Sequence, residues 1–232
     1  CGSSLLPLIY ALRGGVDELE ILKQDGDRAK PGDAIARVKG NARVLLECER
    51  VALNFMQRLS GIATGARKYA DAVKGTKCVV LDTRKTTPGL RRLEKMATHA
   101  GGCTNHRMGL FDAVLIKNNH ITAAGGVKPA LAMAMPEAAR RGIPLEIEVR
   151  TWEEMEDALA CGATKLLLDN LTPQDAARWI AHVGGRASCE ISGGVTLDTV
   201  RAYADAGSDF VSCGALTHSA VAVDLNFRVS LL

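Results

Sequence analysis

The sequence has few aromatic residues, no long apolar run and little excess charge of either sign. Aromatic residues make up 4% of its 232 residues, too few for the stacking platforms that hold single-stranded nucleic acid. The net charge is only +3 and is spread along the chain, so it does not indicate a nucleic-acid partner. No apolar run approaches the ~20 residues that cross a bilayer. These absences exclude a membrane-spanning helix and disfavour nucleic-acid binding.

The sequence also lacks the spacings of common metal and nucleophile sites. Its 7 cysteines are odd in number, and no pair has the CxxC spacing of a zinc or redox site. Several lie inside apolar runs, Cys78 and Cys213 among them, so we expect small buried thiols in a reducing, cytoplasmic environment. No Ser-His-Asp or Cys-His order is evident, which leaves little sign of nucleophilic catalysis.

Hydrophobic residues, 47% of the chain, follow a repeating pattern from about residue 75 to 215. Short apolar runs alternate with stretches of helical period, which predicts βαβ units and a parallel sheet. The predicted strands are 78–81, 113–116, 145–149, 165–168, 187–191 and 209–213. The predicted helices are 91–100, 128–141, 152–160, 173–182 and 196–206. Thr172 before Pro173 is typical of a helix start, and Gly142, Gly162 and Gly207 stand where helices end.

Polar residues follow nearly every predicted strand. In an open parallel sheet, only the strands beside the topological switch point deliver such residues. In a β/α barrel, all the strand ends meet at one mouth. We therefore predict an α/β fold of the barrel type. Six strands are clear, a seventh is expected near residues 101–104, and an eighth is not visible.

The two ends of the chain follow a different pattern. Residues 16–22, 34–38 and 44–47 predict short strands of a small antiparallel β region, with turns between them. A helix is predicted from residue 49 to about 73, where Gly61 and Gly65 suggest a kink or two helices. The alternating tail, 223–232, is expected to return to the β region as a strand. The predicted domains are therefore 1–72 with 223–232, and a barrel of 73–222.

Cations gather after the strands of the first half of the barrel. They are Arg84, Lys85, His106, Arg107 and Lys117. Such cations would repel one another at one mouth unless an anion lay between them. The alternatives are a solvated basic rim and, for the histidine, a catalytic base.

The second half of the barrel offers oxygen ligands and glycine loops. Glu148 lies at the end of its predicted strand and Asp169 directly follows the next one, and both suit sugar hydroxyls or Mg²⁺ on a polyphosphate, although Asp169 could instead be a cap. Ser192-Gly193-Gly194 and Gly214-Ala215 follow the last two strands, the common phosphate site of β/α barrels. These residues predict a phosphorylated, hydroxyl-bearing substrate beside a second anionic partner.

Eight ordered motifs resemble those of quinolinate phosphoribosyltransferases, also called nicotinate-nucleotide pyrophosphorylases (carboxylating). The resemblance covers essentially the whole chain. The motifs are Glu49-Arg50-Val51-Ala52-Leu53-Asn54, Ser60-Gly61-Ile62-Ala63, Asp82-Thr83-Arg84-Lys85-Thr86-Thr87-Pro88-Gly89, Asn105-His106-Arg107, Lys117-Asn118-Asn119-His120, Leu168-Asp169-Asn170, Ser192-Gly193-Gly194 and Gly214-Ala215-Leu216-Thr217-His218.

The resemblance implies a type II phosphoribosyltransferase. Such an enzyme transfers the phosphoribosyl group of 5-phosphoribosyl-1-pyrophosphate to quinolinate and gives nicotinate mononucleotide, pyrophosphate and CO₂ for NAD biosynthesis. It also implies a need for Mg²⁺, an incomplete, seven-stranded β/α barrel with a small N-terminal α/β sandwich domain, and a homodimer or dimer-based oligomer.

The resemblance also implies roles for individual residues. Lys85, Lys117, Glu148 and Asp169 would be catalytic, and the last two would face Mg²⁺ largely through substrate and water. The substrate-binding set would be Arg50, Thr83, Arg84, Lys85, His106, Arg107, Lys117, Glu148, Asp169, Ser192, Gly193, Gly194, Gly214 and Ala215. Arg50 would reach the site of the neighbouring subunit.

The sequence departs from the family pattern at two places. Asn118 stands where many members carry an acid, and Cys1-Gly2 aligns with the interior of the family's sandwich domain. We therefore expect an N-terminal segment to be absent and the mouth to be poorly capped. Two other interpretations remain open: a paralogous phosphoribosyltransferase for another anionic ring, and an inactive, N-terminally truncated form.

Overall fold

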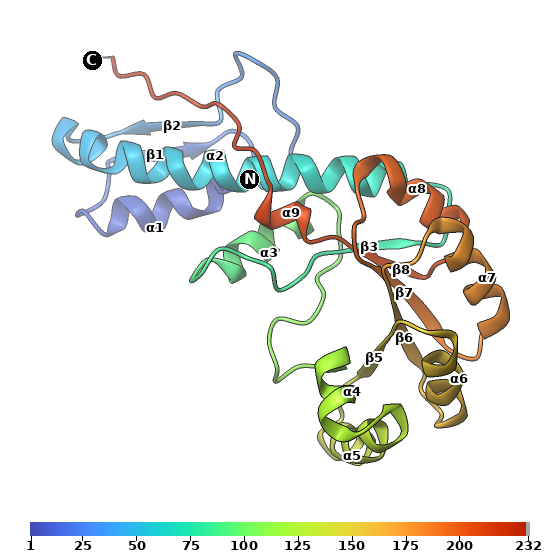
Figure 1. Ribbon diagram of the computed structural model, residues 1–232. Coiled ribbons are helices and arrows are strands. Elements are labelled where there is room, and N and C mark those ends of the chain that lie inside the picture. The colour runs from blue at the N-terminus through green and yellow to red at the C-terminus, as the bar shows by residue number, and fades with distance from the viewer. Residues whose placement is uncertain (231–232) are drawn as a thin grey trace.

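The computed structural model describes residues 1–230 and shows two parts joined by one long helix (Figure 1). The N-terminal part contains η1 (Ser3–Leu5), α1 (Leu6–Ala11), β1 (Glu18–Ile21), β2 (Ala36–Lys39) and the long helix α2 (Ala42–Ala72). The barrel strands are β3 (Val79–Leu81), β4 (Val114–Ile116), β5 (Leu145–Val149), β6 (Lys165–Asp169), β7 (Ser188–Ser192) and β8 (Phe210–Ser212). The other helices are α3 (Arg91–Ala100), α4 (Asn118–Ala124), α5 (Val127–Arg141), α6 (Trp152–Ala160), α7 (Pro173–Val183), α8 (Leu197–Asp205) and α9 (Ala215–His218).

The large sheet is an incomplete β/α barrel, as predicted. Its six strands are parallel and run in the order β3-β8-β7-β6-β5-β4. The expected seventh strand is reduced to one parallel bridge between Thr104 and Leu81, on the edge of β3 away from β8. The wall therefore stays open between Thr104 and β4 within the described residues.

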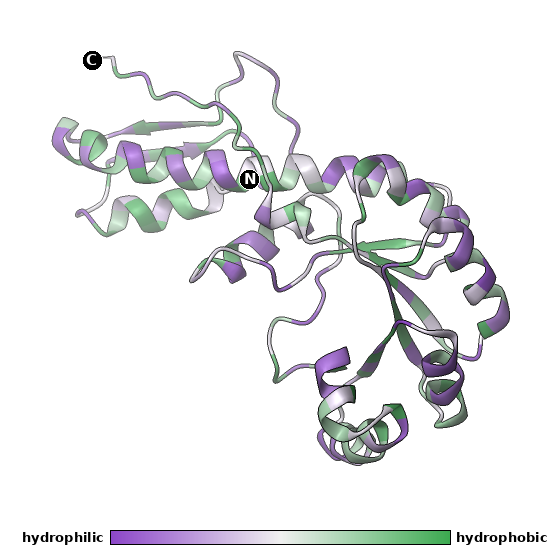
Figure 2. Cartoon of the chain, viewed as in Figure 1, coloured by the Kyte–Doolittle hydropathy of each residue, from purple (hydrophilic) through white to green (hydrophobic). Residues whose placement is uncertain are grey.

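The strands have one apolar face and one charged face. Ile147, Val149, Leu166, Leu168 and Ile191 are fully buried in the main core against the outer helices, and Figure 2 shows the apolar colour of these strands. Since side chains alternate along a strand, the residues between them point into the barrel. These inward residues include acids and a lysine, whereas apolar branched residues usually fill such barrels.

The long helix α2 corrects two sequence expectations. Residues 44–47 were expected to form a strand, but they are the start of α2, which the Asn41 side chain caps by accepting from the Arg43 amide. Leu45 and Cys48 on this first part of α2 pack with α1 in the N-terminal core. Of the kink or two helices expected at the two glycines, the division into two helices does not occur, because α2 runs as one helix of 31 residues.

The N-terminal region also differs in content from the expectation. Its sheet is a single antiparallel pair, β1 with β2, and α1 was not predicted. The tail returns to this region, but residues 223–230 contain no strand, and 231–232 lie outside the described residues. Instead, the Val223 amide donates to Gln57, and Leu225 and Phe227 pack against the N-terminal core.

The predicted helix ends are confirmed. The Thr172 hydroxyl accepts from the Asp175 amide one residue before Pro173. Gly142, Gly162 and Gly207 follow helices with positive φ, the backbone region that side chains other than glycine's avoid. These glycines end each helix just before the segment that leads to the next strand.

Candidate functional site

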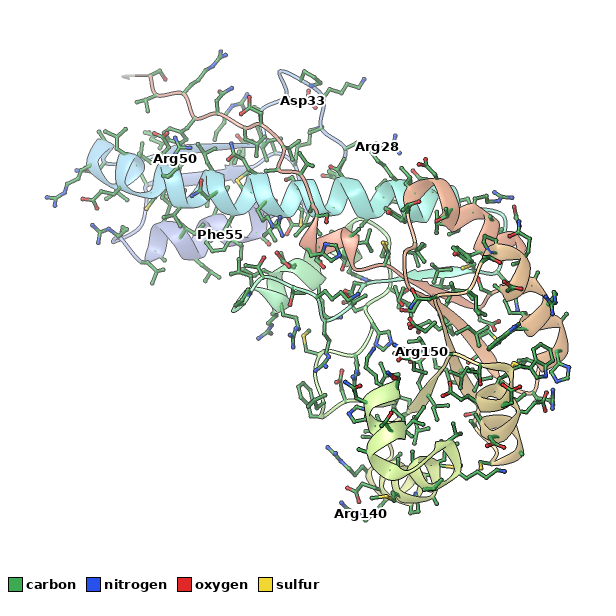
Figure 3. The ribbon with its side chains drawn as sticks, viewed as in Figure 1. Arg28, Asp33, Arg50, Phe55, Arg140 and Arg150 are labelled. Atoms are coloured by element: carbon green, nitrogen blue, oxygen red, sulfur yellow. The ribbon has the colours of Figure 1, made fainter. Side chains whose placement is uncertain are left out.

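A row of ion pairs crosses the ends of β4, β5 and β6. The Lys117 ammonium lies 3.0 Å from Glu148, whose other oxygen lies 3.2 Å from Arg150. The Arg150 guanidinium continues the row to Asp169 at 3.2 Å, and Figure 3 shows this arginine at the inner edge of the barrel. The structure thus brings together three residues that the sequence predicted separately, and it adds Arg150 as the link between the two carboxylates.

Arg84 and Arg107 form a second positively charged group. Burial, and then the charge of Arg84, lower the pKa of Arg107. The Arg107 guanidinium donates to the Ala113 carbonyl at 3.1 Å, and the Arg91 guanidinium holds the Arg84 carbonyl at 3.3 Å. Two neighbouring guanidinium groups are a suitable environment for an anion with two negative groups.

The loop after β3 and the loop after β8 are tied together. The Thr217 hydroxyl donates to the Lys85 carbonyl at 2.8 Å. A Cβ on Gly214 would lie 2.8 Å from the Lys85 side chain, so a larger residue here would have to displace that side chain. Within the first loop, Thr83 accepts from the Lys85 amide at 3.0 Å. Lys85 is therefore held beside the predicted phosphate loop that contains Gly214 and Ala215.

The other predicted phosphate loop is built from consecutive left-handed residues. Gly193 and Gly194 have φ of 93° and 62°, and Asn170 on the neighbouring loop has φ of 59°. A Cβ on Gly193 would lie 2.2 Å from the Asn170 side-chain oxygen, so only glycine fits there. Ser192 pairs in register with Asp169. This loop therefore lies next to the carboxylates of the ion-pair row.

A buried ion pair braces the loop that carries His106 and Arg107. Asp82 and Lys95 are 0% and 1% exposed, and they form an ion pair. The Asp82 carboxylate also accepts from the His106 amide at 2.8 Å and from Asn105 at 2.6 Å, while Lys95 donates to the His106 carbonyl at 2.8 Å. The backbone of this loop is therefore fixed from both sides.

The imidazole of His106 points into the barrel rather than out of its mouth. Its Nε2 lies 3.3 Å from Glu146 and 3.4 Å from Glu190, and Lys165 lies 3.3 Å and 3.0 Å from the same two acids. We call His106, Glu146, Lys165 and Glu190 the floor cluster. The histidine and the two acids have donor atoms within 4.8 Å of one another, close enough for a cation, and the Lys165 ammonium supplies that cation.

The floor cluster borders a cavity of about 510 Å³. The cavity extends from His106 and Arg107 to the first residues of β6 and β8, Lys165 and Phe210. The Lys165 ammonium lies 4.8 Å from the centre of the Phe210 ring, which is a cation–π distance. The open wall between Thr104 and β4 borders this space, so the missing strand leaves the interior accessible.

Arg50 is the predicted site residue that lies apart from the others. Its side chain is 68% exposed and lies 3.6 Å from Glu49. Figure 3 shows it on the part of α2 remote from Arg150. Within this chain, Arg50 therefore does not reach the mouth.

The fold is an incomplete barrel that carries cations and glycine turns at the ends of its parallel strands. These features define a class of protein that binds phosphorylated or carboxylated anions at a single mouth. Residues 62–228 match the family model of the quinolinate phosphoribosyl transferase C-terminal domain, and residues 7–60 match that of the N-terminal domain. The chain therefore belongs to the quinolinate phosphoribosyltransferase family.

Three relatives support this assignment. The probable nicotinate-nucleotide pyrophosphorylase (carboxylating) of Bacillus subtilis is 42% identical over 90% of this chain and 72% of its own length. The chloroplastic nicotinate-nucleotide pyrophosphorylase (carboxylating) of Arabidopsis thaliana is 41% identical over 98% of this chain and 70% of its own length. The solved nicotinate-nucleotide pyrophosphorylase of Francisella tularensis is 36% identical with a TM-score of 0.89, covering 97% of this chain and 79% of that one.

The sequence analysis missed the floor cluster apart from His106, and it missed Arg150 and the Asp82–Lys95 brace. A signal for the cluster was present, because Glu146 and Glu190 each stand between apolar residues inside a strand, and Lys165 directly precedes three leucines. A charge at an inward position of a barrel strand must find a partner in the interior. No helix in residues 1–230 has both the length and the apolar character needed to span a membrane.

Proposed function

We propose that this chain transfers the phosphoribosyl group of 5-phosphoribosyl-1-pyrophosphate to quinolinate with loss of CO₂, giving nicotinate mononucleotide and pyrophosphate for NAD biosynthesis. The observation that carries this proposal is the match of both family domains across residues 7–228. The relatives with the carboxylating name, about 40% identical over most of the chain, support the same reaction.

The binding roles follow from charge and position. Arg84 and Arg107 would hold the two carboxylates of quinolinate, because their fork geometry suits carboxylates, and His106 and Thr83 would complete that side of the pocket. Lys85 and Lys117 would neutralise the pyrophosphate. The loops of Ser192, Gly193 and Gly194 and of Gly214 and Ala215 would bind the 5′-phosphate through backbone N–H groups.

The chemistry needs charge stabilisation more than proton transfer. The pyridine nitrogen attacks the anomeric carbon of the ribose as the bond to the pyrophosphate oxygen breaks, through a state with positive charge on the sugar. Glu148 and Asp169 steady that charge, while Lys85 and Lys117 steady the departing pyrophosphate. The positively charged ring nitrogen then accepts the electron pair left when the 2-carboxylate departs as CO₂, and a proton from water replaces it.

A magnesium ion fits this mouth. Glu148 and Asp169 offer carboxylate oxygens, the ligand class that Mg²⁺ prefers. Because Lys117 and Arg150 already pair with these oxygens, the ion would be held largely through water and the substrate's phosphates. When bound, it would neutralise the pyrophosphate.

We also propose a homodimer in which Arg50 acts in the neighbouring site. The exposed position of Arg50, away from its own mouth, supports this role. We propose the division into residues 1–72 with 223–232, and 73–222, as the two domains of each subunit. Five of the seven thiols are buried, which supports a reducing location such as the cytoplasm.

A comparison of pyridine substrates tests the proposal. The chain is incubated with 5-phosphoribosyl-1-pyrophosphate, Mg²⁺ and either quinolinate or nicotinate, and the mononucleotide is measured. We expect product from quinolinate and at least about 100-fold less from nicotinate. Nicotinate lacks the second carboxylate, so one guanidinium of the pocket is left without its partner. Product from nicotinate alone would instead indicate a paralogous enzyme for another ring.

A further inference from the structure

The floor cluster carries a charge imbalance that the proposed reaction does not explain. Glu146, Lys165 and Glu190 come from β5, β6 and β7, and their side chains meet inside the barrel. Both acids are buried, with exposures of 4% and 0%. Two carboxylates face one ammonium, which leaves one buried negative charge in excess. Buried charges in proteins are almost always paired.

The contacts identify the group that balances this charge. Glu190 uses its Oε2 for Lys165 at 3.0 Å, while its Oε1 has no hydrogen-bond partner and lies 3.4 Å from His106 Nε2. The Oε2 of Glu146 lies 3.3 Å from the same Nε2. A charged imidazole would balance the cluster at two positive and two negative groups.

We propose that Glu146 and Glu190 are positioning residues, which hold the His106 imidazole in its charged form and in one orientation. The ring then adds a permanent positive charge to the wall of the pocket that contains Arg107. This inference rests on the proposed function for its effect on substrate, but the state of the ring itself does not depend on it.

Several groups around His106 oppose the charged form. The Arg107 amide donates to Nδ1 at 2.7 Å, a hydrogen bond that the charged ring gives up. Lys165 competes for the same two acids, and Lys95 donates to the His106 carbonyl. Asp82 acts in the other direction, since it accepts from the His106 amide. Burial raises the pKa of Glu146, but the carboxyl groups of Glu146 and Glu190 lie within 3.4 Å of Nε2, and together they outweigh one amide dipole in a buried site.

The titration behaviour supports this arrangement. Burial alone would lower the pKa of His106, but hydrogen bonds and charge from Glu146 and Glu190 raise that pKa to about 9. Burial likewise favours a neutral Glu190, but His106 and Lys165 hold its pKa at about 2. The ring therefore stays charged across the neutral range, where an ordinary histidine would lose its charge.

The first experiment follows the ring directly. The chain is labelled with ¹⁵N-histidine, and the imidazole signals are recorded by NMR between pH 6 and pH 8.5, with His106→Asn used to assign the signal. We expect the His106 signals of the wild-type chain to show a charged ring throughout this range. In Glu190→Gln, the midpoint should fall into the range. A wild-type His106 that titrates with an ordinary midpoint near 6.5 overturns the proposal, whether or not the chain is active.

The second experiment separates positioning from a merely structural role. In Glu190→Gln, the KM for quinolinate should rise about tenfold from pH 6 to pH 8 as the ring loses its charge, while the wild-type KM changes less than about twofold. The kcat should change little with pH. In a His106→Asn background, Glu190→Gln should add no pH dependence, because the residue on which it acts is gone.

Matched controls keep the test decisive. Glu156→Gln removes the carboxylate beside His182, a histidine–glutamate pair on the surface of α6 and α7, and should leave the KM unchanged at every pH. Glu146→Gln gives a second floor variant if Glu190→Gln folds poorly. An equal rise of the KM at all pH values in both floor variants would show a structural role only and would contradict the proposal.

Discussion

Arg107 has the surroundings that most directly indicate an anionic substrate. It is partly buried, its pKa is lowered first by burial and then by Arg84, and its loop is braced by the buried pair of Asp82 and Lys95. Asp112 and Glu146 act in the other direction, but burial and Arg84 outweigh them, so an added negative charge would be favourable here. The bound substrate would provide that charge.

The first prediction concerns this guanidinium. Arg107→Ala should raise the KM for quinolinate about 10- to 100-fold, since a charge-assisted contact is worth about 1.5–3 kcal/mol. The KM for 5-phosphoribosyl-1-pyrophosphate should change much less. Steady-state kinetics with each substrate varied in turn measures both. Arg140→Ala is the control, because Arg140 pairs with Glu137 on the outer helix α5. Near-normal quinolinate kinetics in Arg107→Ala would refute the pocket assignment.

The second prediction concerns stability and pH at His106. Its folded pKa of about 9 lies above the unfolded value of about 6.5. Its contribution is therefore fully present below pH 6.5 and is lost as the pH rises through about 9. The Tm of the wild-type chain should fall more steeply between pH 6.5 and 9.5 than the Tm of His106→Asn. Parallel Tm curves for the two chains, measured by circular dichroism, would contradict the charged ring.

At the scale of elements, α2 and the tail show how close backbone contacts hold the two parts together. A Cβ on Gly61 would lie 2.1 Å from the Val221 carbonyl oxygen, whereas a Cβ on Gly65 would meet nothing within 4 Å. Gly61 therefore lets the tail cross the helix. In addition, Gln57 and the Val223 and Leu225 backbone exchange hydrogen bonds there.

The third prediction uses these two glycines as a matched pair. Gly61→Ala should lower the free energy of unfolding by about 1–3 kcal/mol, because backbone must move to relieve the overlap. Gly65→Ala should raise it by about 0.5–1 kcal/mol, because alanine favours the helix. Urea unfolding of both variants gives the comparison. Equal effects of the two changes would show that the tail does not pack on α2 as described.

The elements also show which features the sequence could predict. Five helices and six strands of the barrel were predicted within one or two residues at each end, because apolar period and capping residues agree there. Residues 44–47 were predicted wrongly because a short apolar run fits a strand and a helix equally well. The length of the seventh strand could not be predicted from its own residues, since its single bridge at Thr104 depends on pairing with Leu81 at the edge of β3.

The same contrast holds for the site. The mouth residues could be predicted because each follows a strand and belongs to a recognisable motif. The floor cluster could not be predicted, because its other three members all lie 40 or more residues from His106 in the sequence. Only the parallel pairing of β5, β6 and β7 brings those three together. Arg150 was not predicted as a site residue, because its bridging of Glu148 and Asp169 depends on three-dimensional positions.

At the scale of the whole molecule, the separation of Arg50 from its own mouth predicts shared sites. Arg50→Ala and Lys85→Ala should each be nearly inactive alone. Mixed and allowed to exchange subunits, they should recover about a quarter of wild-type activity, because half of the dimers are then mixed and each has one intact site. Activity is measured before and after exchange. No recovery, with exchange verified by mass, would show that Arg50 does not act in the neighbouring site.

The measurement that tests the central claim most directly follows CO₂ and mononucleotide together. The chain is mixed with quinolinate labelled in its 2-carboxylate, 5-phosphoribosyl-1-pyrophosphate and Mg²⁺, and each component is omitted in turn. We predict equal amounts of labelled CO₂ and nicotinate mononucleotide when all three are present, and neither when either substrate is omitted. Mononucleotide without CO₂, or no product from a folded, dimeric chain, would contradict the account.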